Sequence, residues 1–152
     1  MRLASPVPGT VRALRTVADR VFAEGIVGPG TAVDPVRTAV QHVLAPVDGV
    51  VVALHPHAFV VRTPDERSVL VHLGIDTVRL AGQGFELHVV AGQSVRAGER
   101  VVTWSPVDVA AAGLPTTCPL VALEASPSLL ALLLEPGETV AAGQALLEWT
   151  DA

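Results

Sequence analysis

Lysine is absent from this chain of 152 residues, which also has no tyrosine and a single cysteine. Without a lysine amine the chain cannot form a Schiff base, bind phosphate with a Walker lysine, or carry biotin or lipoate. The lone Cys118 excludes an intramolecular disulfide and a thiolate metal cluster, which fits a reducing cytoplasm. We therefore expect Cys118 to be a small, buried apolar residue.

Positive charge and long apolar runs are also scarce. The 10 basic residues against 15 acidic ones give a net charge of −5, which argues against non-specific binding of nucleic acid or of anionic membranes. No apolar run approaches the roughly 18 to 20 residues of a membrane span, and prolines and arginines interrupt the N-terminus where a signal peptide would have its apolar core. The sequence thus predicts a cytoplasmic protein.

The chain is rich in small aliphatic residues, glycine and proline, a composition that favours many short strands and turns. Two pairs of segments are similar: residues 5–14 (SPVPGTVRAL) match 45–54 (APVDGVVVAL), and residues 92–104 match 137–149. Because such units cannot bury their apolar faces alone, they must pack on each other as sheets. We predict one all-β domain, residues 1–152, an antiparallel β-sandwich or flattened barrel with a duplicated hairpin motif and one or two short helices.

The local pattern gives a coarse assignment of the remaining elements. Apolar runs predict strands at residues 21–27, 58–62, 68–73 and 118–124. Helical patterns are confined to residues 107–113 and 128–134, the second with Ser126 or Ser128 as its N-cap. Residues 34–41 read as a surface loop, and we expect residues 1–4 to be poorly ordered.

Three of the five histidines fall within 18 residues and are the candidates for chemistry. His55 and His57 would project from one face of an extended chain, and Pro56 between them places the pair at a strand edge or entering a turn. His72 ends an apolar strand just before a glycine, where its imidazole would be kept neutral with a free lone pair. We expect His42 and His88 to be ordinary packed or surface residues.

Several segments together resemble one family. His57 with Ala58 and Phe59, the run VHLGIDTV around His72, VFAEGIVGPG at 21–30 and APVDG at 45–49 are similar to the IIA component of the glucose class of the bacterial phosphoenolpyruvate-dependent sugar phosphotransferase system. The resemblance implies a compact antiparallel β-sandwich with a duplicated hairpin. It also implies a phosphocarrier that takes a phosphoryl group from the protein HPr and passes it to the IIB domain of a sugar permease.

The resemblance assigns roles by position. His72 would carry the phosphoryl group on Nε2, His57 would donate a hydrogen bond to it, and the Gly74 carbonyl would hold the Nδ1 proton of His72. Asp19 and Asp76 match acidic residues beside the site, where they would meet an arginine of HPr. The apolar docking rim would comprise Val21, Phe22, Ile26, Val27, Leu70 and Val78. His55 and Pro56 depart from the polar residues usual in the family.

No cofactor is expected, although zinc could be captured adventitiously if His55, His57 and His72 converge, with Asp76 as a fourth ligand. Two other functions are compatible with the pattern. A lysostaphin-like zinc endopeptidase also uses a His-x-x-x-Asp motif and a His-x-His motif, but in the reverse order along the chain. A regulatory module could use the same apolar rim to bind transporters or enzymes in one phosphorylation state only.

Overall fold

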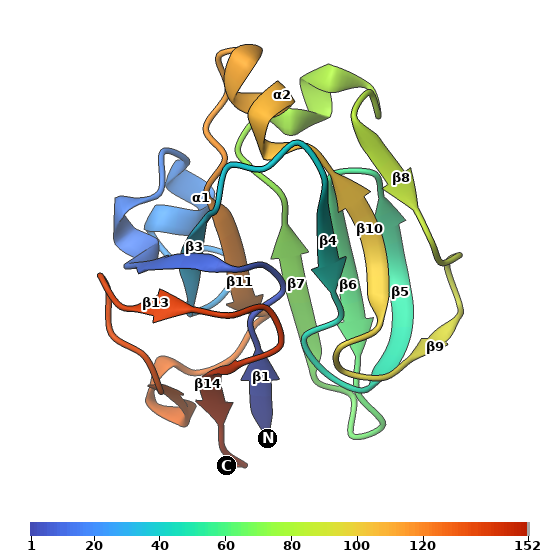
Figure 1. The fold of residues 1–152 in the computed structure, drawn as a ribbon. Helices are drawn as coiled ribbons and strands as arrows, with labels where there is room; N and C mark the ends of the chain where they lie inside the picture. The colour runs from blue at the N-terminus through green and yellow to red at the C-terminus, as the bar shows by residue number, and fades with distance from the viewer. Residues whose placement is uncertain (152) are drawn as a thin grey trace.

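Three antiparallel sheets make up the protein in the computed structural model, which describes residues 1–151 (Figure 1). The eight-stranded sheet has the order β13-β2-β3-β11-β7-β6-β5-β9. Its strands are β13 (Thr139–Val140), β2 (Gly9–Arg12), β3 (Gly30–Pro35), β11 (Cys118–Ala122), β7 (Ser68–His72), β6 (Ala58–Arg62), β5 (Gly49–His55) and β9 (Ser94–Val95). The two three-stranded sheets are β1 (Arg2–Ala4), β14 (Ala145–Trp149) and β12 (Leu130–Leu132), and β4 (Gln41–Leu44), β10 (Arg100–Trp104) and β8 (Phe85–Leu87).

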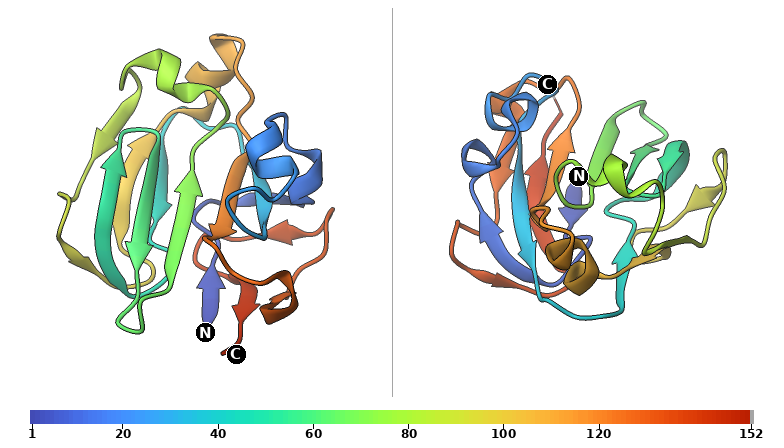
Figure 2. Two further views of the ribbon diagram at one scale, coloured as in Figure 1. Left: turned by 180° about the vertical axis from the view of Figure 1, so that it is seen from behind. Right: turned by 90° about the horizontal axis from the view of Figure 1, so that it is seen from above.

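In the eight-stranded sheet, the strands on one side of the β11–β7 pair are arranged like those on the other side. This internal symmetry confirms the predicted duplication. β2 pairs with β13 as β5 pairs with β9, and β14 lies between β1 and β12 as β10 lies between β4 and β8. The two halves lie side by side, one built from both ends of the chain and the other from its middle (Figure 2). The sheets are open, so the fold is a sandwich and not a closed barrel.

The glycine shared by the two repeats has one physical role in both. A Cβ on Gly9 would lie 1.9 Å from the Asp34 carbonyl oxygen, and a Cβ on Gly49 would lie 2.2 Å from the Arg62 carbonyl oxygen. Each glycine therefore lets its strand approach a neighbouring strand more closely than any other residue could. The two repeats therefore share the same strand packing at this glycine as well as similar sequences.

One apolar core joins the sheets. Val, Leu and Ala supply most of it, and each half adds one tryptophan, Trp104 at 1% and Trp149 at 5% exposure. The Cys118 side chain is fully buried in the same core, as expected. None of the helices within residues 1–151 has the length and apolar content that would let it span a bilayer.

Most predicted elements are confirmed. β6, β7 and β11 lie where strands were expected, and the helix expected at 107–113 is α2 (Pro106–Ala111), with the Ser105 side chain accepting a hydrogen bond from the Asp108 N–H. Three 3₁₀ turns complete the fold: η1 (Leu14–Thr16), η2 (Thr77–Leu80) and η3 (Pro127–Leu129).

Three expectations differ from the structure. Residues 21–27 do not form a strand, because the Asp19 carboxylate caps α1 (Arg20–Ala23) and Gly25, at φ +67°, ends it. Residues 128–134 are not a helix, since η3 leads straight into β12, which pairs with β14. Residues 2–4 form β1 against β14, with Leu3 fully buried, where we expected poor order.

Candidate active site

His57 and His72 meet because two paired strands bring them together. β6 pairs with β7 so that Ala58 lies opposite His72, and His57 directly precedes Ala58. The two imidazole centroids are 5.3 Å apart at an interplanar angle of 73°, an edge-on arrangement. The backbone adds a second link, since the Leu73 N–H donates to the His57 carbonyl oxygen at 2.8 Å.

The orientation of the His72 ring is set by the turn that follows it. Its Nδ1 lies 2.5 Å from the Gly74 carbonyl oxygen, which can only accept, so Nδ1 carries the proton. Gly74 has φ +73°, and a Cβ there would lie 2.8 Å from the Pro115 carbonyl oxygen. Only glycine fits this position. In the neutral ring the lone pair is then on Nε2.

Phe22 also packs against the ring of His72. Their centroids are 5.2 Å apart at 61°, and Phe22 is only 7% exposed. The resemblance implied that Phe22 belongs to the apolar docking rim, whereas the helical turn capped by Asp19 buries it against the imidazole of His72. Phe22 thus limits the motion and hydration of the His72 ring.

Burial keeps both imidazoles uncharged. The pKa of His72 is lowered, chiefly by burial, although the Gly74 carbonyl and the charges of Asp19 and Asp76 act in the opposite direction. The pKa of His57 is lowered by burial first, then by repulsion from a charged His72 and, least, from a charged His55. Near neutral pH the site therefore offers a lone pair on His72 and a neutral neighbour.

The residues expected at the docking rim differ in exposure. Val21, Ile26 and Val78 are 42%, 65% and 64% exposed, while Val27 and Leu70 are partly covered. Asp76 is exposed in a left-handed conformation just before η2. Apart from Phe22, the residues expected at the rim are at least partly exposed. An open groove runs on from Ile26 and Val27 to Trp149.

His55 extends the row of rings. It ends β5, and a tight turn through Pro56 brings its ring to 5.8 Å from that of His57, tilted by 33°. The two rings are neighbours through this turn and not through the alternation of an extended chain. Within the described part of the chain, no three side chains of the His, Cys, Asp or Glu type are placed to hold a metal ion.

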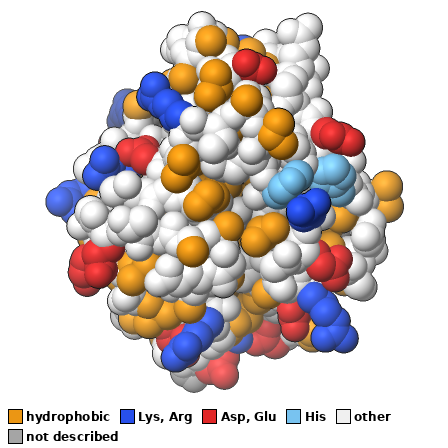
Figure 3. Space-filling view, in the orientation of Figure 1, with side chains coloured by type: hydrophobic (Ala, Val, Ile, Leu, Met, Phe, Trp, Pro, Cys, Tyr) orange, Lys and Arg blue, Asp and Glu red, His pale blue; other side chains and the backbone are white. Residues whose placement is uncertain are grey.

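His42 and His88 lie outside the site. Both approach the hydroxyl of Thr103, from His42 Nδ1 at 2.9 Å and from His88 Nε2 at 2.6 Å. His42 lies in β4 and His88 directly follows β8, and histidine side chains are visible over this sheet in Figure 3. Their expected role as packed or surface residues is consistent with this placement.

The comparisons with known proteins agree with one another. The profile of the family described as "phosphoenolpyruvate-dependent sugar phosphotransferase system, EIIA 1" matches residues 1–127. The chain is 35% identical over 128 residues to the "PTS system glucose-specific EIIBCA component" of Corynebacterium glutamicum, covering 83% of this chain and 18% of that protein. It is 36% identical over 104 residues to the "PTS system glucose-specific EIIA component" of Bacillus cereus, covering 67% and 61%.

A solved structure shares the fold. "Glucose permease IIA from Mycoplasma capricolum" superposes with a TM-score of 0.85 at 32% identity, over 97% of this chain and 94% of that one. The chain spans less than two thirds of the two sequence relatives, 18% and 61% of their lengths. Neither the zinc peptidase nor the purely regulatory module gains support from these matches.

Proposed function

Since the chain belongs to the EIIA 1 family of the phosphoenolpyruvate-dependent sugar phosphotransferase system, we propose that it is a phosphocarrier of that system. It takes a phosphoryl group from phospho-HPr onto His72 and passes it to the IIB domain of a sugar permease. A phosphocarrier of this kind would act in the cytoplasm, where it would meet HPr.

The observation that carries this proposal is the fixed tautomer of His72. The Gly74 carbonyl occupies Nδ1 at 2.5 Å, and burial disfavours a charged ring, so Nε2 is an uncharged nucleophile at neutral pH. The adjacent edge-on imidazole of His57 supplies a nearby N–H for a group held on Nε2.

In the transfer step, the bond between phosphorus and the donor imidazole of HPr breaks as the bond between phosphorus and His72 Nε2 forms. The electron pair of the broken bond stays on the HPr ring, and the Nδ1 proton of His72 remains hydrogen-bonded to Gly74. Such a transfer passes through a loose, metaphosphate-like state, so the protein mainly aligns the two rings and donates hydrogen bonds to the phosphoryl oxygens. His57 is assigned that donor role.

The surface fits partners that dock repeatedly and leave. Exposed Val21, Ile26 and Val78 would exclude water from the phosphohistidine, which water would otherwise hydrolyse. The carboxylates of Asp19 and Asp76 would meet an arginine beside the donor histidine of HPr. The Corynebacterium glutamicum relative carries B, C and A components in one chain according to its name, which supports a IIB domain as the second partner.

Incubation with phosphoenolpyruvate, enzyme I and HPr tests the proposal. We expect one acid-labile phosphate, mapped to His72 by mass spectrometry, and none on His72→Ala. The matched control is His42→Ala, which removes a half-buried histidine outside the site and should leave phosphorylation intact. An acid-labile phosphate on His72→Ala would overturn the assignment.

A further inference from the structure

A buried threonine holds the turn that follows His72. Thr77 is the first residue of η2 and is 1% exposed, although its neighbour Val78 is 64% exposed. A hydroxyl that is buried this completely requires a partner. Its Oγ1 donates a hydrogen bond to the Leu73 carbonyl oxygen at 2.7 Å.

Leu73 lies between His72 and Gly74, and with this hydrogen bond both its backbone N–H and its carbonyl have a partner. The Leu73 N–H donates to the His57 carbonyl oxygen at 2.8 Å, and its carbonyl accepts from Thr77. Leu73 itself is fully buried. Both of its peptide groups are therefore held, and the direction of the next carbonyl, that of Gly74, is restricted accordingly.

The methyl group of Thr77 restricts Gly74 from a second direction. A Cβ on Gly74 would lie 2.7 Å from Thr77 Cγ2 and 2.8 Å from the Pro115 carbonyl oxygen, so these two groups enclose the glycine. The Ile75 N–H donates to the same Pro115 oxygen at 3.0 Å. Gly74 is thus held between Thr77 and Pro115, with its own carbonyl on His72 Nδ1.

We infer that Thr77 is a positioning residue for phosphoryl transfer, because its hydroxyl holds the Leu73 carbonyl and thereby keeps the Gly74 carbonyl on Nδ1 of His72. The inference rests on the proposed function, in which Nε2 is the accepting atom. A neutral imidazole carries one proton, and the hydrogen bond at one nitrogen decides which nitrogen has it. Thr77 acts through Leu73 and Gly74, so its loss releases the proton to either nitrogen.

Two substitutions separate the hydroxyl from the methyl group. Thr77→Val keeps the shape and removes the O–H, whereas Thr77→Ser keeps the O–H and removes the methyl. The matched control is Thr63→Val, because Thr63 is also buried, at 4% exposure, and its hydroxyl accepts from the Arg67 N–H at 3.1 Å at the opposite end of the β6–β7 hairpin.

Nitrogen-15 NMR of the histidine rings, recorded without any partner, reports the tautomer of His72. We expect Thr77→Val to show a mixture of tautomers and to accept phosphate from phospho-HPr about tenfold more slowly or worse, since small misplacements of reacting groups cost this much. Thr77→Ser and Thr63→Val should retain the wild-type tautomer and accept phosphate within about threefold of the wild-type rate.

A wild-type tautomer and rate in Thr77→Val would overturn the inference, as would a Thr77→Ser protein that loses the tautomer as fully as Thr77→Val. If Thr77→Val fails to fold, Thr77→Ala replaces it in the comparison with Thr77→Ser. A wild-type protein that accepts no phosphate would overturn the proposed function, whereas the tautomer measurement depends on no partner and decides on Thr77 separately.

Discussion

The two ends of the β6–β7 hairpin are held in place by different interactions, apolar packing at one end and ion pairs at the other. At one end, His57 and His72 lie in an apolar setting, and both imidazoles have lowered pKa values because burial disfavours their charge. At the other end, Arg67 forms ion pairs with Asp65 at 2.7 Å and with Asp151 at 3.4 Å. The same pair of strands thus carries an uncharged end and a charged end.

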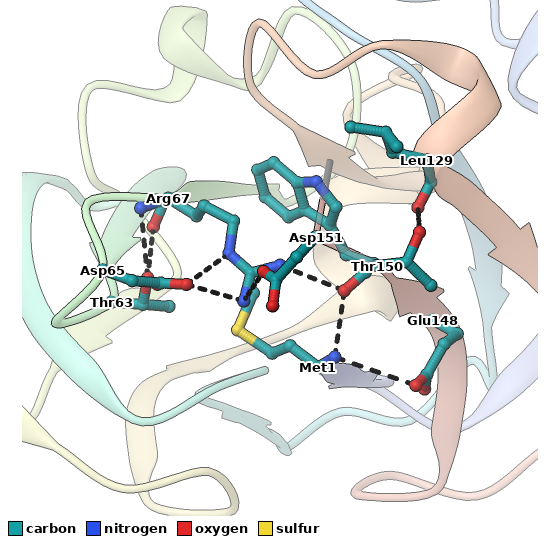
Figure 4. Close-up of polar contacts among 9 residues, drawn as sticks. Met1, Thr63, Asp65, Arg67, Leu129, Glu148, Thr150 and Asp151 are labelled. Carbon is teal, nitrogen blue, oxygen red and sulfur yellow. Dashed lines mark hydrogen bonds and ion pairs between the residues drawn. The ribbon is translucent and has the colours of Figure 1, made fainter.

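The charged end ties the hairpin to the terminal strands (Figure 4). Arg67 donates to the Trp149 carbonyl oxygen at 3.0 Å, and its guanidinium lies 5.3 Å from the centre of the Trp149 ring. The Met1 N donates to the same carbonyl oxygen at 2.9 Å. Thr63 closes the turn by hydrogen bonds to Asp65 and to the Arg67 backbone.

This difference shows how one hairpin can hold reactive histidines at one end while ion pairs anchor it to the rest of the fold at the other. Protonation of His72 would remove the lone pair that phosphoryl transfer requires, so the two rings are held by packing and by backbone hydrogen bonds. The Arg67 end has no such constraint and is anchored by charge and by stacking on Trp149. Changes at the two ends should therefore separate transfer from stability.

The largest effect is expected from His57→Gln. The variant should still accept phosphate on His72, but it should pass the group on about 100-fold more slowly, because the donor that stabilises the departing metaphosphate-like group is altered. Quench-flow measurement of both half-reactions checks this, with His88→Gln as the control outside the site. Equal slowing of acceptance and onward transfer would argue for a structural role of His57.

The second largest effect concerns stability and the opposite end. Arg67→Met should lower the free energy of unfolding by about 2 kcal/mol, because it removes two ion pairs and leaves the Trp149 carbonyl without this donor. Phosphate acceptance by the folded protein should not change. Arg62→Met is the control, since Arg62 is exposed on the same hairpin and forms no ion pair within residues 1–151. Denaturant unfolding that gives both variants the same loss would contradict the comparison.

Much of this comparison was accessible from the sequence. The repeated glycine and the alternating apolar residues predicted the duplicated sheets, and the resemblance to the IIA family identified His57 and His72 as a pair; the pairing of β6 with β7 that brings them together comes from the fold. The Arg67 network was not predictable, because Asp65, Trp149 and Asp151 are separated along the chain and only the fold brings them together. Thr77 was missed for the same reason, since its burial depends on the packing of η2 and not on local pattern.

The two incorrect element assignments also have physical causes. Residues 21–27 (VFAEGIV) are apolar at spacings that suit either a strand or a helical turn, and the Asp19 cap decides the outcome. Asp19 as an N-cap residue was the available signal. Residues 128–134 are rich in leucine, a good helix former, but pairing with β14 outweighs that propensity.

As the pH falls, protonation should affect the histidine end of the hairpin first and the Arg67 end later. The pKa values of His57 and His72 are lowered in the folded state, so the unfolded chain binds protons more readily and stability falls as the pH drops below about 6.5. Phosphate acceptance falls at lower pH still, as the pH passes the lowered pKa of His72 in the folded protein, because a protonated His72 has no lone pair. The pKa of Asp65 is lowered by the Thr63 hydroxyl and Arg67, so its contribution persists until the pH falls below about 4.

Proton NMR of the His rings and of the Arg67 Nε–H, followed from pH 7.5 to 3, checks this order. The signals of the histidine rings should shift first as the pH falls, and the Arg67 Nε–H signal should change last. Loss of the Arg67 signals above pH 5, or acceptance that already falls at pH 7.5, would show that the two ends are not separated by charge in the way the structure indicates.

The smallest effect is expected from His55→Thr. A charged His55 repels a second charge on His57, and this repulsion is the least of the three causes that lower the His57 pKa. Removing it should raise the His57 pKa slightly, in a titration followed by NMR, and should change phosphate transfer by less than about threefold. His88→Thr is the control for loss of an exposed histidine elsewhere. A large fall in transfer in His55→Thr, with the His57 pKa unchanged, would mean that His55 acts on the phosphoryl group or on a partner directly, and the uncharged end would then consist of three histidines and not two.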